Sequence, residues 1–138
     1  MVGQPIPDFE LPRLGGGTVK MSELKGHPVL INYWTTWCPP CKEELPLLQA
    51  RQDQYPDLVV LAVDTDEEEP VVKAYIDQYG YTFTVLLDFD WEVERLLGVQ
   101  AYPTTFFVDA DGIVRSRYIG GMSAKVLDSN LKLIGVGE

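Results

Sequence analysis

Val29-Leu30-Ile31-Asn32-Tyr33-Trp34 is followed, after Thr35-Thr36-Trp37, by Cys38-Pro39-Pro40-Cys41, and this stretch decides the fold. The nearly continuous apolar run predicts a strand that is buried on both faces. Prolines are tolerated in the first turn of a helix, because the N–H that they lack would be unpaired there. The stretch therefore predicts a strand–helix junction with a cysteine at the point where the helix begins.

The flanking sequence continues the alternation of strands and helices. We expect a short edge strand at 9–11, a helical turn at 22–24, strands at 58–63 and 83–87, helices at 69–79 and 91–97, a hairpin of 104–108 and 113–119, and a last helix at 124–134. Strands joined by helices lie parallel, and a hairpin adds antiparallel pairs. The expected fold is α/β, with three layers (α/β/α) and a central mixed sheet, in one domain over 1–138 (lead-in 1–25, core 26–138).

Charge excludes some classes of partner. Twenty-one Asp and Glu residues against eleven Lys and Arg residues give a net charge of −10. Nucleic-acid binding needs a basic surface that neutralises phosphates, so no nucleic-acid partner is expected. The longest uncharged stretch, 26–41, is interrupted by polar residues and prolines and falls short of the ~20 apolar residues of a membrane span. No integral membrane segment is expected.

Cys38 and Cys41 are the only two cysteines. Two such ligands cannot close a tetrahedral zinc site, so no metal is expected, and no organic cofactor is implied either. A structural disulfide closing so short a loop would stabilise the chain little. The pair is therefore interpreted as a dithiol that cycles between reduced and oxidised states.

The position of Cys38 predicts which cysteine attacks a disulfide and which resolves the mixed disulfide. A helix N-terminus presents unpaired N–H groups and a positive partial charge, both of which favour a thiolate and lower the pKa of Cys38. Cys41 lies one turn further into the helix and should be more buried. Cys38 is thus expected to attack a disulfide and Cys41 to resolve the mixed disulfide. Pro39 and Pro40 lack N–H groups, so the lowering of the Cys38 pKa should be moderate.

Four stretches carry a family resemblance: Trp34-Thr35-Thr36-Trp37-Cys38-Pro39-Pro40-Cys41-Lys42, the following Glu43-Glu44-Leu45-Pro46, the lead Pro5-Ile6-Pro7-Asp8-Phe9-Glu10-Leu11, and 98–109. They resemble the thioredoxin superfamily, and within it the extracytoplasmic ResA/TlpA-like branch of thiol–disulfide oxidoreductases. The resemblance implies a thioredoxin-like fold with an extra N-terminal strand. It also implies a cis peptide bond before Pro103, and a substrate groove that includes Trp37, Pro39, Tyr102 and Pro103.

An acid near the dithiol is implied by the same resemblance. Asn32 stands where thioredoxin has a buried acid, and an amide cannot take the proton that Cys41 must lose. In the ResA-like branch the acid comes from the loop after the next strand, which points to Glu67, with Asp64 and Asp66 in reserve. If Glu67 serves the dithiol, its pKa should be raised. The alternative is that 64–69 is simply a solvated acidic loop.

The resemblance also implies partners and a compartment. We expect a monomeric reductant of disulfides in partner proteins, with cytochrome c maturation as one such role, recharged by an upstream thiol donor. No basic, apolar leader follows Met1. We therefore expect an extracytoplasmic domain, periplasmic or membrane-tethered, whose leader is absent from this sequence, with a cytoplasmic protein as the alternative.

Two other functions remain open at this point. The chain also resembles the AhpC/TSA group, and a peroxiredoxin-like thiol peroxidase would carry P-x-x-x-[ST]-x-x-C. Thr35 and Cys38 satisfy the second half of that signature, but Ile31 replaces its proline. The other alternative is a copper or haem-assembly thiol carrier, since thiolates hold Cu(I). The copper-delivery relatives have three residues between the cysteines and a distal histidine, and neither feature occurs here.

Overall fold

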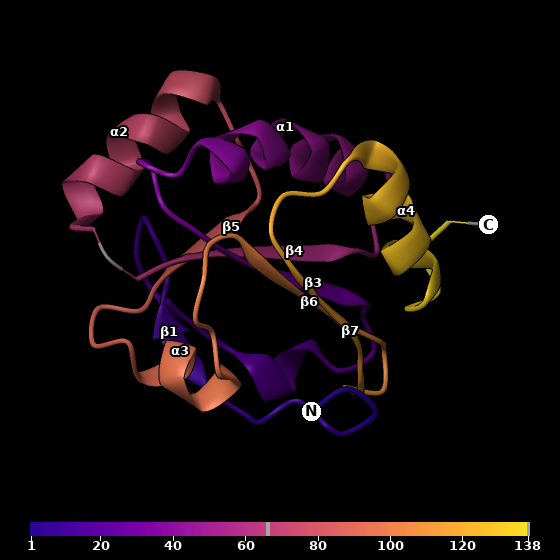
Figure 1. Cartoon of the computed structure of the whole chain (residues 1–138). Coiled ribbons are helices and arrows are strands. Elements are labelled where there is room, and N and C mark those ends of the chain that lie inside the picture. Colours follow the sequence, from indigo (N-terminus) through magenta and orange to yellow (C-terminus); the bar gives the residue numbers. More distant parts are fainter. Residues whose placement is uncertain (66, 138) are drawn as a thin grey trace.

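A five-stranded mixed sheet forms the centre of the molecule (Figure 1). The structure is a computed structural model that describes residues 1–65 and 67–137. The strand order is β5-β4-β3-β6-β7, with β3, β4 and β5 parallel and β6 and β7 each antiparallel to its neighbour. The strands are β3 (Val29–Trp34), β4 (Val59–Asp64), β5 (Thr84–Leu87), β6 (Thr104–Val108) and β7 (Val114–Ile119). All of β3 is buried, because it has a strand on each side and a layer on each face.

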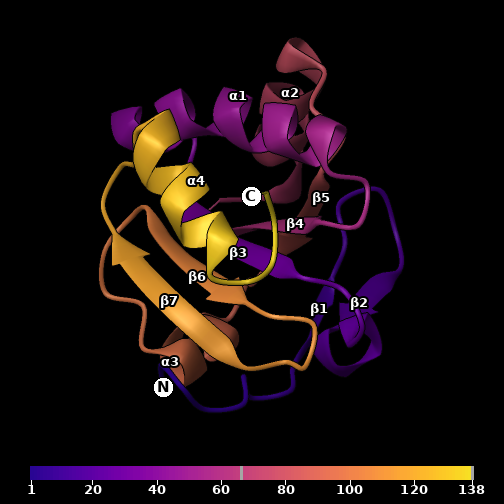
Figure 2. The ribbon, with the colours of Figure 1, turned by 90° about the vertical axis from the view of Figure 1, so that its right-hand side faces the viewer.

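Helices cover both faces of this sheet. Side chains of α1 (Pro39–Gln54), α2 (Glu69–Tyr79) and α4 (Ala124–Lys132) share one apolar cluster with Leu30 and Trp34 of β3. α3 (Glu92–Leu97) and the amino-terminal segment pack with Ile31 and Tyr33 in a second cluster. Figure 2 shows α1 and α4 on one side of the sheet and α3 on the other. The expected three-layer, thioredoxin-like α/β/α fold is confirmed.

The amino-terminal segment forms a sheet of its own. β1 (Glu10–Pro12) pairs with β2 (Thr18–Lys20), and a 3-10 turn over Met21–Leu24 follows. Gly15–Gly17 all have positive φ, and this turn brings β2 back beside β1. We expected one extra strand here and missed β2. The N–H of Leu14 donates to the carbonyl of Val85 (2.9 Å), which attaches the segment beside β5.

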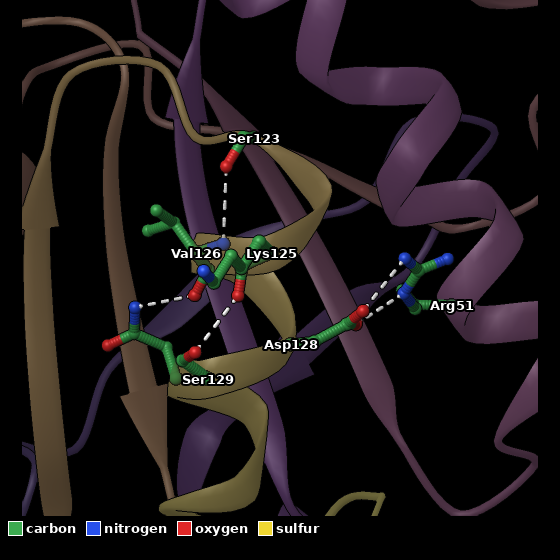
Figure 3. A network of polar contacts seen from close by, with 7 residues as sticks. Arg51, Ser123, Lys125, Val126, Asp128 and Ser129 are labelled. Atoms are coloured by element: carbon green, nitrogen blue, oxygen red, sulfur yellow. Dashed lines mark hydrogen bonds and ion pairs between the residues drawn. The ribbon is translucent and has the colours of Figure 1, made fainter.

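α4 is attached to α1 by a pair of parallel hydrogen bonds. The Arg51 guanidinium donates to both carboxylate oxygens of Asp128, at 2.6 and 3.1 Å (Figure 3). The hydroxyl of Ser123 caps α4 by accepting from the N–H of Val126 (3.3 Å). The loop that precedes α4 passes close to the start of α1, since a Cβ at Gly121 would lie 3.2 Å from the Cβ of Pro40. Among the described residues, no helix is long and apolar enough to cross a bilayer.

Candidate active site

A disulfide between Cys38 and Cys41 lies where β3 has ended and α1 begins. Cys38 is the N-cap of α1, with an extended backbone, and Pro39 and Pro40 occupy the first helical positions. Cys38 retains 4% of its surface, whereas Cys41 is fully buried. The expected strand–helix junction and the deeper burial of Cys41 are both confirmed.

The Sγ of Cys38 accepts a hydrogen bond from the backbone N–H of Cys41, at 3.3 Å. Pro39 and Pro40 offer no N–H, so this donor and the positive end of α1 are what the helix provides to a thiolate at Cys38. The arrangement favours the thiolate form of Cys38 and can support nucleophilic attack on a disulfide.

Tyr102 and Trp37 meet beside the dithiol. The Tyr102–Pro103 peptide bond is cis, as the resemblance implied. Pro103 is buried, and Tyr102 is half-buried. The Trp37 ring is 58% exposed and meets the Tyr102 ring edge-on, with centroids 6.2 Å apart. Pro39, the first residue of α1, is exposed as well. The structure thus brings Trp37, in the loop between β3 and α1 that leads to the dithiol, against Tyr102, which precedes the cis-proline.

Glu67 contacts the loop before the dithiol through Thr36. The backbone N–H of Thr36 donates to Glu67 Oε1 (2.7 Å), and its hydroxyl donates to Oε2. Burial raises the pKa of Glu67, but hydrogen bonds with Asp64 and Thr36 outweigh it, so the pKa lies below its ordinary value. The expected upward shift is therefore wrong, because Thr36 and Asp64 both form hydrogen bonds with this carboxylate.

The reserve candidates for the buried acid are Asp64 and Asp66. Asp64 is buried at the end of β4, opposite Trp34 in the register, and shares a hydrogen bond with Glu67. Asp66 lies outside the described residues. Asn32 is buried, as expected, and its amide donates to the hydroxyl of Thr105 (2.9 Å).

Glu44 is an acid that the sequence analysis missed. Its side chain is 1% exposed, and neither carboxylate oxygen has a hydrogen-bond partner of good geometry among the described residues. Burial raises the pKa of Glu44 to about 7, against a smaller opposite effect of the Met122 N–H. Glu44 follows Cys41 by three positions, so the two share a face of α1. The available signal was its place in the buried stripe of Cys41, Leu45 and Leu48.

Within residues 1–65 and 67–137, no three His, Cys, Asp or Glu side chains gather in a group that would hold a metal ion. The chemistry that the site offers is that of two sulfurs, a helix N-terminus and nearby carboxyl groups.

The fold and site define a class. A disulfide-forming C-x-x-C pair at the start of the helix after a central strand, beside a cis-proline, is the arrangement of a thioredoxin-fold thiol–disulfide oxidoreductase. The chain belongs to the AhpC/TSA family, whose model matches residues 2–117.

Curated relatives and a solved structure agree with this class. The chain is 36% identical to thioredoxin-like protein YneN of Bacillus subtilis, over 95% of this chain and 79% of the relative. It is 34% identical to thiol-disulfide oxidoreductase ResA of Bacillus anthracis, over 96% and 78%. A putative thiol:disulfide interchange protein DsbE from Chlorobium tepidum superposes with a TM-score of 0.89 at 31% identity, over 98% and 99% of the two chains. The protein is therefore a thiol–disulfide oxidoreductase.

Proposed function

We propose that this protein reduces disulfides in partner proteins, with Cys38 as the attacking cysteine and Cys41 as the resolving one. The observation that carries this assignment is the place of Cys38 at the N-cap of α1, where its sulfur accepts the N–H of Cys41 and keeps some exposure. Cys41 is fully buried, so an incoming disulfide meets Cys38 first.

The exchange has two steps. The Cys38 thiolate attacks one sulfur of the partner's disulfide, which forms a mixed disulfide and releases the other partner sulfur as a thiolate. The Cys41 thiolate then attacks Cys38 Sγ, which breaks the mixed disulfide and releases the second partner thiolate. The partner gains two electrons, and this protein ends as the Cys38–Cys41 disulfide, the form of the structure.

Two carboxyl groups take different parts in this scheme. Glu44 accepts the proton of Cys41, because a buried acid with a pKa of about 7 can exchange a proton at neutral pH. Glu67, with a lowered pKa, stays ionised and holds the dithiol loop through Thr36. The proton-accepting part first expected of Glu67 thus passes to Glu44.

The partner's chain lies across a surface made by Trp37, Pro39, Tyr102 and Pro103. Trp37 and Tyr102 are the exposed and half-exposed aromatic rings beside the sulfurs, and such rings give area for apolar contact. The chain acts as a monomeric single domain outside the cytoplasm, periplasmic or membrane-tethered, recharged by an upstream thiol donor. Support for the compartment, and for a role in cytochrome c maturation, comes from the resemblance to the ResA/TlpA-like branch.

Trapping tests the proposal. The Cys41→Ser variant, reduced and mixed with oxidised insulin, should accumulate a mixed disulfide through Cys38, visible as a covalent adduct on a non-reducing gel. The matched Cys38→Ser variant should form no such adduct, because Cys41 is buried. Adducts through Cys41 in the Cys38→Ser protein would reverse the assignment.

A further inference from the structure

Three side-chain oxygen atoms from separate parts of the chain meet: the Tyr102 hydroxyl, Glu94 Oε1 and the Thr65 hydroxyl. The hydroxyl of Tyr102 donates to Glu94 Oε1, and the hydroxyl of Thr65 lies 3.0 Å from the same oxygen. The two hydroxyls are 2.7 Å apart. Thr65 follows β4, Glu94 belongs to α3, and Tyr102 precedes the cis-proline. The carboxylate of Glu94 thus joins the substrate-side tyrosine to two other elements.

Glu94 is itself held in place. Its backbone N–H donates to Asp88 Oδ2 (2.7 Å), and the N–H of Val93 reaches Asp88 Oδ1 (3.4 Å). Asp88 is 2% exposed and follows β5, so a buried carboxylate fixes the first turn of α3 against the sheet. The position of Glu94 is therefore set by the core rather than by solvent-exposed contacts.

We propose that Glu94 is a positioning residue for substrate recognition, which holds Tyr102 in the orientation that a partner's disulfide-bearing chain meets. The inference rests on the proposed function, since it assumes that Tyr102 contacts the partner. Tyr102 meets Trp37 edge-on, so the orientation of Tyr102 also decides where Trp37 finds support beside the sulfurs. Without Glu94, the tyrosine must be ordered when the partner binds, and that ordering weakens binding.

This role differs from a purely structural one. A contact that only stabilises α3 would affect the stability of the protein without separating one disulfide substrate from another. A positioning residue acts on substrates large enough to touch Tyr102. It leaves the attack of Cys38 on a small disulfide unchanged, because Glu94 contacts neither sulfur among the hydrogen bonds of the described residues.

The test compares two substrates. Reduced wild-type protein and the variants Glu94→Ala, Glu94→Gln and Tyr102→Phe are mixed with oxidised insulin and, separately, with bis(2-hydroxyethyl) disulfide. The concentration dependence of each rate gives a half-saturating concentration and a maximal rate. Glu92→Gln is the matched control, because it removes the same charge from the same helix at an exposed position.

Glu94→Ala should raise the half-saturating insulin concentration about tenfold, as expected for loss of one hydrogen bond to a charged group. Glu94→Gln should fall between Glu94→Ala and wild type, because its amide oxygen still accepts a hydrogen bond. Tyr102→Phe should repeat the loss, and adding it to Glu94→Ala should cost little more, because both remove the same contact. The rate of Glu94→Ala and Glu94→Gln with the small disulfide, and both rates of Glu92→Gln, should match wild type.

Equal losses with both substrates, or no loss with insulin, would overturn the positioning role. Tyr102→Phe keeps the test decisive if Glu94→Ala fails to fold, because it leaves the α3 backbone contacts in place. A wild-type protein that reduces the small disulfide but not insulin would instead overturn the proposed function, and the inference with it. The two failures are therefore distinct.

Discussion

Glu44 follows Cys41 by one turn of α1, and both side chains are buried on the same face of that helix. Residues at this spacing are neighbours on a helix surface. Cys41 must lose a proton before it attacks the mixed disulfide, and its burial keeps it from bulk water. A buried carboxyl group one turn away gives that proton a nearby acceptor. Asn32 cannot take this role, because an amide does not accept the proton.

Glu44→Gln should slow disulfide exchange at neutral pH by about tenfold to a hundredfold, because an amide cannot accept the Cys41 proton. The pKa of Glu44 is raised to about 7, so its ionised, proton-accepting form grows as the pH rises through that value. The pH–rate profile of the variant should lose this inflection. The exposed neighbour Glu43→Gln serves as control. A Glu44→Gln profile identical to wild type would remove Glu44 from the mechanism.

The same substitution should change how stability depends on pH. Burial raises the folded-state pKa of Glu44 from 4.5 to about 7, so its favourable contribution is present below pH 4.5 and is lost as the pH rises through 7. Glu44→Gln should thus gain about 2 kcal/mol relative to wild type between pH 5 and pH 8. Denaturant unfolding of the disulfide form at both pH values measures the difference. An equal effect at the two values would contradict the burial argument.

Cys38 should react with an alkylating agent before Cys41 in the reduced protein, and with a thiol pKa below the ~8.5 of a free cysteine. The cause is the helix N-terminus and the Cys41 N–H, which favour a thiolate at Cys38. Mass spectrometry after brief alkylation at several pH values gives both the order and the pKa. Faster labelling of Cys41 would contradict the assignment.

Glu67→Gln should reduce stability at neutral pH by about 1 kcal/mol, since the carboxylate is partly exposed and its hydrogen bonds to Thr36 are screened by solvent. The folded-state pKa is lowered, so the stabilisation is present above pH 4.5 and is lost as the pH falls through the folded-state pKa. The gap between variant and wild type should therefore close in acid. The exposed neighbour Glu68→Gln is the control. Loss of the inflection near pH 7 in Glu67→Gln would return the proton-accepting role to Glu67.

Local signals explain what the sequence could predict. The apolar run of β3 and the two prolines at the start of α1 each act within a few residues, and they located the dithiol junction. Resemblance supplied the cis-proline at Pro103, which spacing alone does not indicate.

Tertiary contacts explain what the sequence could not predict. β2 has only three residues, Thr18–Lys20, and none is buried, so it carries no periodic signal. The burial of Glu44 depends on the surrounding core, including the Met122 region that leads to α4. The pKa direction of Glu67 depends on two partners, Thr36 and Asp64, from different strand ends. Such contacts between distant segments leave no pattern in either segment.

The dithiol should be reducing, with a potential nearer the about −270 mV of thioredoxin than the about −120 mV of a strong oxidant. A strong oxidant has an unusually stabilised reduced form, and here the Cys38 sulfur accepts the Cys41 N–H while Pro39 and Pro40 donate nothing. Pro40→Ala restores one N–H at the start of α1 and should raise the potential by about 30 mV, which corresponds to about 1.4 kcal/mol for two electrons. Equilibration with a glutathione or dithiothreitol series gives both values from the fluorescence of Trp37, which adjoins Cys38. Lys42→Arg, at an exposed position in the same turn of α1, adds no N–H and keeps the charge, so it is the control for Pro40→Ala. A wild-type potential above about −160 mV would make this protein an oxidant, because its disulfide would then be too easily reduced for it to act as a donor of electrons.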